Sequence, residues 1–272
     1  MIKIIFCDMD GTLLDGEGKI PPMFDEVMGE LKKRGVIFAP ASGRQYSALL
    51  RQMGAYIDDF IFISENGTFI ARHDEEIWSS VMSRDDVRRA LELGLTVPRC
   101  YSVLCGKRIA YVTREWEPYM ENMRQFFTVS EYVDDMFAVA ANEDIIKVAF
   151  CDPERGDAER TIYPPLTALN DRVHVVLSSN YWVDVMNKGV NKGAAVGRVQ
   201  KALGISPDEC ASFGDYLNDI EMLRAVRYGF AMENAHDEAK RAARYSAPRN
   251  TEYGVMTKLR ELMDKGLIGN AE

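Results

Sequence analysis

The chain has 272 residues, of which 47% are hydrophobic and 28% are charged, and its formal net charge is −9 at pH 7. This length provides a substantial core in one large or two modest domains. The acidic balance opposes binding to nucleic acid. The N-terminus has no secretory apolar region, and no apolar run approaches the roughly 20 residues that cross a bilayer. We therefore expect a cytoplasmic protein with no membrane partner.

Short, mostly apolar runs recur in both terminal thirds of the chain, and each is typical of a buried parallel strand. They occupy residues 3–7, 36–41, 60–64, 210–213 and 228–232. Amphipathic segments of helical length lie between them, at residues 22–34, 44–53, 192–203 and 218–226. This alternation predicts an α/β fold with a doubly wound (Rossmann-like) parallel sheet that both ends of the chain build together.

The middle of the chain has a different pattern. Its predicted strands are residues 101–104, 109–113, 145–150, 173–177 and 182–186, and its predicted helices are residues 85–93, 118–127 and a segment from residue 157 that Pro164 and Pro165 interrupt. Paired strands with intervening helices predict a small α+β insert at residues 82–187, within a core of residues 1–81 and 188–272. Residues 269–272 are predicted to be a frayed tail.

Two carboxylates follow the first predicted strand directly. Asp8 and Asp10 emerge at the carboxyl edge of that strand, where open α/β sheets bind ligands. Side chains two residues apart in an extended segment point the same way, so one acid can attack a reacting centre while the other handles a proton. Gly11 then allows a sharp turn. Taken alone, these residues are equally compatible with an acidic turn.

A second acidic cluster, Asp215 and Asp219, follows another predicted strand and reaches the same edge. Two like charges about 4 Å apart repel by roughly 4 kcal/mol at an effective dielectric near 20, and a divalent cation relieves that repulsion. Oxygen ligands with room for water and a phosphate favour Mg²⁺ over caged Ca²⁺. The three histidines are scattered, which argues against zinc.

Two further segments begin predicted helices. Ser42, Gly43 and Arg44 offer a hydroxyl and free backbone N–H groups, which form a phosphate cradle at a helix N-terminus. Lys192 opens the helix that returns to the core, where a lysine can hold both a nucleophile and a phosphoryl oxygen. Alone, the first segment is also compatible with an ordinary N-cap, and a lone lysine with a solvated surface charge.

In chain order, residues 8–15 (DMDGTLLD), 41–44 (ASGR), 191–193 (NKG) and 214–219 (GDYLND) resemble the four motifs of the haloacid dehalogenase superfamily of phosphohydrolases. The finer match is to its Cof-type branch (subclass IIB, sugar-phosphatase-like), whose α/β cap lies between the second and third motifs, as the predicted insert does. Residues 64–67 (SENG) and 233–235 (ENA) also look like that branch. The resemblance is specific in the core and weak in the cap.

The resemblance implies a Mg²⁺-dependent phosphatase that works through an aspartyl-phosphate. It implies that Asp8 is the nucleophile, that Asp10 is the general acid and base, and that Ser42 and Lys192 hold the phosphoryl group. The implied metal site comprises the carboxylate of Asp8, the backbone carbonyl of Asp10, and Asp215, with Asp219 either as a further ligand or, like Asn218, as a group that orients the ligands or the phosphate.

The cap should close over the site, exclude water and select the leaving group. Arg44, Asn180 and Tyr181 are candidates for contact with the substrate, although Asn180 and Tyr181 are also compatible with a polar turn. Tyr216 stands where many members have a small residue, so it is expected to reshape the site. A covered site suits a small phosphorylated metabolite, with sugar phosphates expected first. The expected state is a monomer or homodimer.

Two alternatives remain open from the sequence. A phosphosugar mutase would use the same nucleophile and acid, and it would need cap cations such as Arg99, Arg108 and Arg114 for a second phosphate. A non-catalytic phospholigand-binding protein would keep the fold without turnover. The paired acids Asp8 and Asp10 speak against it, since a pure binder needs neither a nucleophile nor a proton donor.

Overall fold

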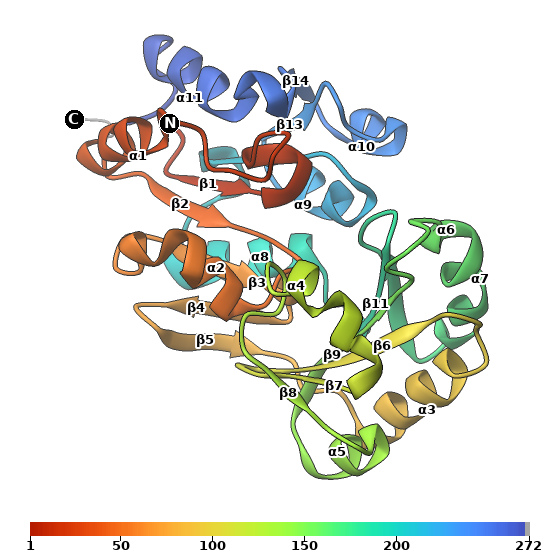
Figure 1. Ribbon diagram of the computed structural model, residues 1–272. Coiled ribbons are helices and arrows are strands. Elements are labelled where there is room, and N and C mark those ends of the chain that lie inside the picture. The colour runs from red at the N-terminus through yellow and green to blue at the C-terminus, as the bar shows by residue number, and fades with distance from the viewer. Residues whose placement is uncertain (270–272) are drawn as a thin grey trace.

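The structure is a computed structural model that describes residues 1–269. A parallel core sheet lies beside a second, mostly antiparallel cap sheet (Figure 1). Residues 270–272, which belong to the predicted frayed tail, lie outside the described residues. Within the described residues, no helix is both long enough and apolar enough to cross a membrane.

The core sheet joins strands from both ends of the chain. Its order is β14-β13-β12-β1-β2, and every pair in it is parallel. The strands are β1 (Ile4–Cys7), β2 (Ile37–Pro40), β12 (Cys210–Gly214), β13 (Tyr228–Met232) and β14 (Tyr245–Ala247). Because β1 lies between β2 and β12, the two terminal thirds of the chain meet at β1. The predicted α/β class and the doubly wound sheet are confirmed.

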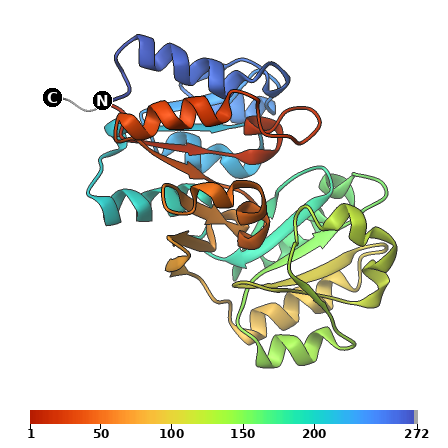
Figure 2. The ribbon, with the colours of Figure 1, turned by 60° about the vertical axis from the view of Figure 1, so that its left-hand side comes forward.

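Helices cover both faces of this sheet because successive residues of its strands point to opposite sides. Ile5 and Cys7 pack in one cluster with residues of α1 (Phe24–Lys33) and α11 (Gly254–Asp264). Ile4 and Phe6 pack in another cluster with α8 (Lys192–Leu203) and α9 (Ile220–Arg224). Figure 2 shows the red helix α1 and the dark blue helix α11 together on one side of the core sheet.

One predicted strand pairs differently from the expectation. β3 (Ile61–Ser64) was expected to be parallel like the other core strands, but it forms an antiparallel sheet with β4 (Phe69–Arg72) and β5 (Glu75–Ser79). Its link to the core sheet is an isolated parallel bridge between Ala41 and Ile63. The chain reverses directly after β3, and the β4–β5 hairpin turns through residues 73 and 74, which have positive φ without glycine. The β4–β5 hairpin therefore carries no ordinary hairpin signal, whereas Asn66 and Gly67, between β3 and β4, form the Asn-Gly dipeptide that is typical of a hairpin turn.

The cap sheet has the order β10-β11-β9-β6-β7-β8. Its strands are β6 (Tyr101–Gly106), β7 (Ala110–Val112), β8 (Ser130–Tyr132), β9 (Ile145–Cys151), β10 (Val173–Leu177) and β11 (Trp182–Asn187). Val148 and Phe150 pack with α3 on the face away from the core, where α3 (Arg84–Gly94), α5 (Met136–Asn142), α6 (Ala158–Thr161) and α7 (Tyr163–Leu166) lie (Figure 1). The opposite face of the sheet is free to meet the core.

Several elements differ from the sequence prediction. The predicted helix at residues 118–127 is a 3₁₀ segment (Arg114–Tyr119) followed by one α-helical turn, α4 (Met120–Met123), because Pro118 removes a backbone donor. β8, α5, α10 (Asp237–Ala242), β14 and α11 were not predicted. The proposed core and cap boundaries fall between β5 and α3 and between β11 and α8. That division into domains stays a prediction.

Candidate active site

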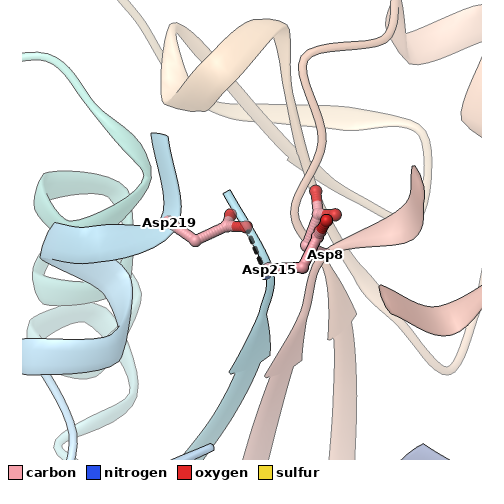
Figure 3. A group of neighbouring side chains, drawn as sticks. All are labelled: Asp8, Asp215 and Asp219. Carbon is pink, nitrogen blue, oxygen red and sulfur yellow. Dashed lines mark hydrogen bonds between the residues drawn. The ribbon is translucent and has the colours of Figure 1, made fainter. Parts of the chain in front are cut away.

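Three carboxylates from separate segments converge above the ends of two neighbouring strands (Figure 3). Asp8 follows β1 and Asp215 follows β12, and these parallel strands are in register, with Cys7 opposite Phe213. Asp219 reaches the same place from the turn before α9. One oxygen of each carboxylate lies within 4.8 Å of the others. The site therefore lies at the carboxyl ends of β1 and β12, where the strand order of the sheet reverses. Open α/β folds ordinarily bind ligands at this position.

The turn after Asp8 holds Asp215 in place. Gly11 has a φ of 75°, and a Cβ atom at this position would collide with the carboxylate of Asp215. Thr12 donates a hydrogen bond from Oγ1 to Oδ1 of Asp215, over 2.8 Å. Glycine is thus required by both the backbone conformation and the close approach. Thr12 was not among the predicted site residues, although it stands inside the first motif.

Lys192 lies beneath the carboxylates at the start of α8. Asn191 caps this helix by accepting the backbone N–H of Ala194 on Oδ1, over 2.7 Å. The fully buried Lys192 ammonium pairs with Oδ1 of Asp8 and, over 2.6 Å, with Oδ1 of Asp219. Burial acts to lower the pKa of Lys192, but Asp219 and Asp8 outweigh burial and the pKa is raised. The ammonium therefore stays charged and orients the Asp8 carboxylate.

Asp219 is occupied by donors from its own neighbourhood. Besides Lys192, it accepts the backbone N–H groups of Asp215 and Tyr216 on Oδ2, over 2.9 and 3.1 Å. Gly214 allows this approach, because a Cβ atom there would lie 2.5 Å from the Cβ of Asp219. These contacts suit a residue that orients the site more than one that offers free lone pairs to a metal.

The remaining carboxylate oxygens fit a divalent cation. Burial, followed by the charge of Asp219, raises the pKa of Asp8 well above its ordinary value and raises the pKa of Asp215 to about 7. Oδ2 of Asp215 carries no hydrogen bond from a donor in residues 1–269, and Oδ1 of Asp8 accepts from Lys192 alone. Crowded negative charge with free hard oxygen ligands is the donor set that Mg²⁺ prefers.

Ser42, Gly43 and Arg44 form a loop between β2 and α2 (Tyr46–Met53). Ser42 is 1% exposed, and its hydroxyl accepts the backbone N–H of Arg44 over 3.1 Å. The predicted helix was expected to begin at Arg44, but it begins two residues later because the N–H of Gln45 donates to the carbonyl of Phe126 in the cap. The candidate phosphate cradle is therefore a loop braced by the cap, not the first turn of a helix.

Arg44 links the candidate acid and base to the cap. Its Nε donates to Oδ2 of Asp10 over 2.7 Å, and a second guanidinium nitrogen contacts Oδ1 of the same carboxylate. The guanidinium also donates to the carbonyl of Gln125 over 3.3 Å and lies 5.2 Å from the ring centre of Phe126. Arg44 is 5% exposed. In this conformation it is engaged by Asp10 and by the cap.

A pocket of about 480 Å³ lies between core and cap over these residues. Seven of the predicted site residues line it from the core: Asp8, Asp10, Ser42, Gly43, Arg44, Asp215 and Asn218. The cap contributes an apolar and aromatic wall, with Met123, Phe126, Phe127, Tyr181 and Trp182. A wider groove of about 800 Å³ along β14 and α11 contains none of the predicted site residues.

Three predicted site residues do not line the pocket. Lys192 and Asp219 are fully buried beneath it. Asn180 is turned away because its Oδ1 accepts the hydroxyl of Tyr216 over 3.1 Å, within the turn between β10 and β11. Tyr216 therefore reaches across to the cap, and it also lines the pocket. The role of Asn180 as a substrate contact stays a prediction without support from its position.

Other lining residues were not predicted from the sequence. Lys147 and Asp184 reach the pocket from the central cap strands β9 and β11. Each is a single charge inside an otherwise apolar predicted strand, and such a charge must find a partner when buried. That pattern was the available signal. Trp182 stacks 6.0 Å from Trp116 within the cap, and it also lines the pocket.

Comparison with known proteins agrees with this geometry. The family profile described as haloacid dehalogenase-like hydrolase matches residues 5–259. The chain is 31% identical to the 5-amino-6-(5-phospho-D-ribitylamino)uracil phosphatase of Escherichia coli strain K12, over 98% of this chain and 96% of the relative. It is 27% identical to the HMP-PP phosphatase of Klebsiella pneumoniae, over 88% of this chain and 87% of the relative.

Solved structures give the same result. The crystal structure of SMU.1108c from Streptococcus mutans superposes with a TM-score of 0.88 at 26% identity, covering 97% of this chain and 100% of that chain. The family and the phosphatase relatives confirm the predicted enzyme class, a phosphoric monoester hydrolase. The chain therefore belongs to the haloacid dehalogenase-like hydrolase family, in the Cof-type branch that its motifs predicted.

Proposed function

We propose that the protein is a Mg²⁺-dependent phosphatase that hydrolyses small phosphomonoesters, sugar phosphates first among them, through an aspartyl-phosphate. One observation carries the proposal. Asp8 is held on one carboxylate oxygen by Lys192, while its other oxygen has no protein donor and the residue lines the pocket between core and cap. A fixed carboxylate with one free oxygen is prepared for attack on phosphorus.

In the first half of the reaction, the free oxygen of Asp8 forms a bond to phosphorus as the bond to the leaving oxygen breaks. The leaving oxygen takes a proton from Asp10, which lines the same pocket. Ser42 and Lys192 hold the phosphoryl oxygens, and the ammonium offsets the charge that develops on them. Arg44 contacts Asp10 before the substrate arrives, and the incoming phosphate competes for its guanidinium.

In the second half, Asp10 takes a proton from water, and the water oxygen attacks phosphorus. The bond between phosphorus and Asp8 breaks, which releases inorganic phosphate and restores the Asp8 carboxylate. Lys192 remains paired with Asp219 throughout, so the site keeps its positive charge in both halves. Asn218, which lines the pocket and donates to Asn66 over 2.9 Å, is proposed to orient the phosphate.

The proposed Mg²⁺ ligands are the Asp8 carboxylate oxygen that does not attack phosphorus, Asp215 and the backbone carbonyl of Asp10, and Asp219 is proposed to orient them. When bound, Mg²⁺ would neutralise charge on the phosphoryl oxygens and on the crowded carboxylates. The raised pKa values of Asp8 and Asp215 support the need for such a cation. Both carboxylate oxygens of Asp219 already accept hydrogen bonds, one from Lys192 and the other from two backbone N–H groups, which supports an orienting role for Asp219.

The size and lining of the pocket support a small substrate. A volume of about 480 Å³ suits a metabolite, and the aromatic cap wall would contact the part of the substrate beyond the phosphate. The name of the Escherichia coli relative describes a phosphorylated ribityl chain on a uracil ring, so we extend the expected substrates to sugar or polyol phosphates that carry a ring. A cytoplasmic location and a monomeric or dimeric state stay predictions.

The cap cations favour hydrolysis over a mutase. Arg99 pairs with Glu154, and Arg108 pairs with Asp74 over 2.8 Å. Arg114 lies over the ring of Tyr132 at 5.8 Å. None of the three arginines lines the pocket within the described residues, so they offer no site for a second phosphate.

The test is phosphate release from a panel of sugar phosphates, polyol phosphates, nucleotides, pyridoxal phosphate and flavin mononucleotide, with Mg²⁺ and with EDTA. Release that requires Mg²⁺ and is absent from Asp8→Asn supports the proposal and ranks the substrates. Release that EDTA does not affect would reject the metal role. A panel without any release, tested with a protein that melts cooperatively, would favour a binding function instead.

A further inference from the structure

A buried group of charges joins the cap to the core beside the active site. Lys147, in the middle of β9, places its ammonium 2.5 Å from Oε2 of Glu65 and 3.3 Å from Oδ1 of Asp184. It also donates to the backbone carbonyl of Gly43 over 2.8 Å. Lys147, Glu65 and Asp184 are at most 2% exposed. We call these three residues the junction cluster; Glu65 comes from the core, and the other two come from cap strands.

The ammonium of Lys147 is engaged by three oxygens of the protein, through one hydrogen bond to Gly43 and ion pairs with Glu65 and Asp184. It has three N–H donors, and three oxygens surround it. Burial acts to lower the pKa of Lys147, but Asp184 and Glu65 outweigh burial and the pKa is raised. The group therefore remains charged, and its contacts hold it to the protein's own oxygens. Its function must be exerted through the groups that it holds.

The core side of the junction cluster is strained. Glu65, Asn66 and Gly67 have φ values of 50°, 55° and 91°. Glycine and, less often, asparagine adopt this region at little cost, so the strain falls on Glu65, whose backbone persists because its surroundings hold it. Strain of this kind concentrates at functional sites. These residues belong to the segment SENG, whose role the catalytic assignment leaves unexplained.

The strained turn forms hydrogen bonds with the loop that carries Ser42. The N–H of Asn66 donates to the carbonyl of Ser42 over 2.9 Å, and the N–H of Glu65 donates to the carbonyl of Arg44 over 3.0 Å. Lys147 holds the carbonyl of Gly43 between them. All three consecutive carbonyls of the candidate phosphate loop are therefore fixed, the outer two by the core and the middle one by the cap.

A second link ties the same turn to the cap. The side chain of Asn66 donates to Asp184 and, over 2.9 Å, to Ser178, and it accepts the amide of Asn218 over 2.9 Å. The loop, the strained turn and Asn218 therefore share contacts that exist when the cap sheet is seated on the core. A displaced cap sheet would withdraw Lys147 and Asp184 together.

We propose that Lys147 is a positioning residue that couples seating of the cap to phosphate binding. The seated cap places the ammonium on the carbonyl of Gly43 and so fixes the loop in which Ser42 presents its hydroxyl and the following N–H groups. Coupling is reciprocal, so a bound phosphate in turn favours the seated cap. The inference rests on the proposed function insofar as the Ser42 loop binds the phosphoryl group.

The test compares variants that remove or keep the hydrogen bond from the Lys147 ammonium to the carbonyl of Gly43, which we call the tether. Lys147→Met removes it but leaves two buried acids without a cation. Lys147→Met/Glu65→Gln removes the tether and one acid, whereas Glu65→Gln alone keeps the tether. The matched control is Lys107→Met, since Lys107 also joins the cap to the core, through an ion pair with Glu76 in which both side chains are more than 30% exposed. Thermal melting confirms folding of each variant.

Loss of the tether should lower kcat/KM about 10- to 100-fold and raise the inhibition constant of inorganic phosphate about 10-fold. Glu65→Gln should change both by less, and Lys107→Met should leave both within about twofold. If the double variant melts cooperatively and retains the phosphate affinity of Glu65→Gln, Lys147 does not position the loop and the inference is overturned.

A measurement on the unaltered protein removes dependence on how the variants fold. Hydrogen exchange with and without inorganic phosphate should show that amides at residues 42–45, 65–67, β9 and β11 gain protection together. Protection confined to the core loop would overturn the coupling. If phosphate binding depends on Lys147 but no ester is hydrolysed, this inference holds and the phosphatase proposal is rejected. If esters are hydrolysed at a rate that does not depend on Lys147, the phosphatase proposal holds and this inference is rejected.

Discussion

The two sides of the pocket are built in opposite ways. The core side consists of charged and polar groups that follow strand ends directly, such as Asp8 after β1 and Asp215 after β12. The cap side is mainly an aromatic and apolar wall, in which Phe126 comes from irregular chain and Tyr181 is 45% exposed, and its charges Lys147 and Asp184 are paired with each other. The difference teaches that the core fixes charges in place, whereas the cap offers an adaptable apolar surface.

This contrast assigns different consequences to substitutions on the two sides. A charge fixed at a strand end acts on the phosphoryl group, which every substrate shares. An aromatic wall contacts the leaving group, which differs between substrates. Core substitutions should therefore lower the rates for all substrates by a similar factor, and cap substitutions should change the ranking of substrates.

The largest effect is expected from Asp8→Asn. An amide cannot form the phosphoryl bond, so turnover should fall by at least about 10³-fold with every substrate. The fold should remain, because Lys192 keeps Asp219 as a partner and a crowded negative charge is removed. Phosphate release and thermal melting measure the two results. Unchanged rates would remove Asp8 from the role of nucleophile.

A somewhat smaller effect is expected from Asp10→Asn. The variant lacks a proton donor for the leaving oxygen and a base for water, so formation and breakdown of the aspartyl-phosphate should each slow by about 10²- to 10⁴-fold. Rapid-quench single turnovers measure the two steps separately. The slower formation should be smallest for substrates with good leaving groups, such as aryl phosphates. Normal kinetics in both steps would contradict the acid and base role.

The core was predictable from the sequence because its elements are specified locally. Short apolar strands, each followed by a motif and a helix, fix both the sheet and the positions of Asp8, Asp215 and Lys192. Two strands of the core were harder to predict: β14 is only three residues long, and β3 leaves the parallel pattern because the chain reverses directly after it, through residues 65–67. Tertiary contacts decided β14, whereas Asn66-Gly67 was an available local signal for the reversal after β3.

The contacts between distant segments were not predictable in the same way. Lys147 and Glu65 are 82 positions apart in the numbering, and neither sequence neighbourhood specifies the other. The isolated charge in an apolar strand predicts that Lys147 has a buried partner, but not which partner. The sequence likewise named Arg44 as a substrate contact, whereas the structure pairs it with Asp10. Side-chain pairing across the core and cap requires coordinates.

Phe126→Ala tests the cap side. Removing this half-buried ring should lower kcat/KM about 10-fold for ring-bearing or bulky substrates, and less for small ones such as acetyl phosphate. Phe137→Ala is the matched control, because Phe137 is a 36% exposed aromatic residue of the cap on α5, outside the pocket lining. An equal loss across all substrates would show that the cap contributes to chemistry as the core does, and the contrast between the two sides would fail.

The smallest expected effect is a pH-dependent stabilisation by Mg²⁺, and it examines the core without turnover. Burial and Asp219 raise the pKa of Asp215 from its ordinary value of 3.8 to about 7. Because the folded protein then binds a proton that the unfolded chain has lost, this group's contribution to stability is present below about pH 4 and is lost as pH rises through 7. Without a divalent cation, the free energy of unfolding should therefore fall between these values.

A cation that binds the ionised carboxylates reverses this trend. Mg²⁺ at about 100 times its Kd should raise Tm by about 5 °C at pH 8, and by less at pH 5, where protons compete for Asp215. Asp215→Asn should remove most of the shift at pH 8. An equal shift at both pH values, or one that survives in the variant, would place the cation elsewhere. Because the cap has no crowded carboxylates in the pocket wall, Phe126→Ala should leave the Mg²⁺-dependent rise in Tm unchanged. That result would show that the core alone binds the cation.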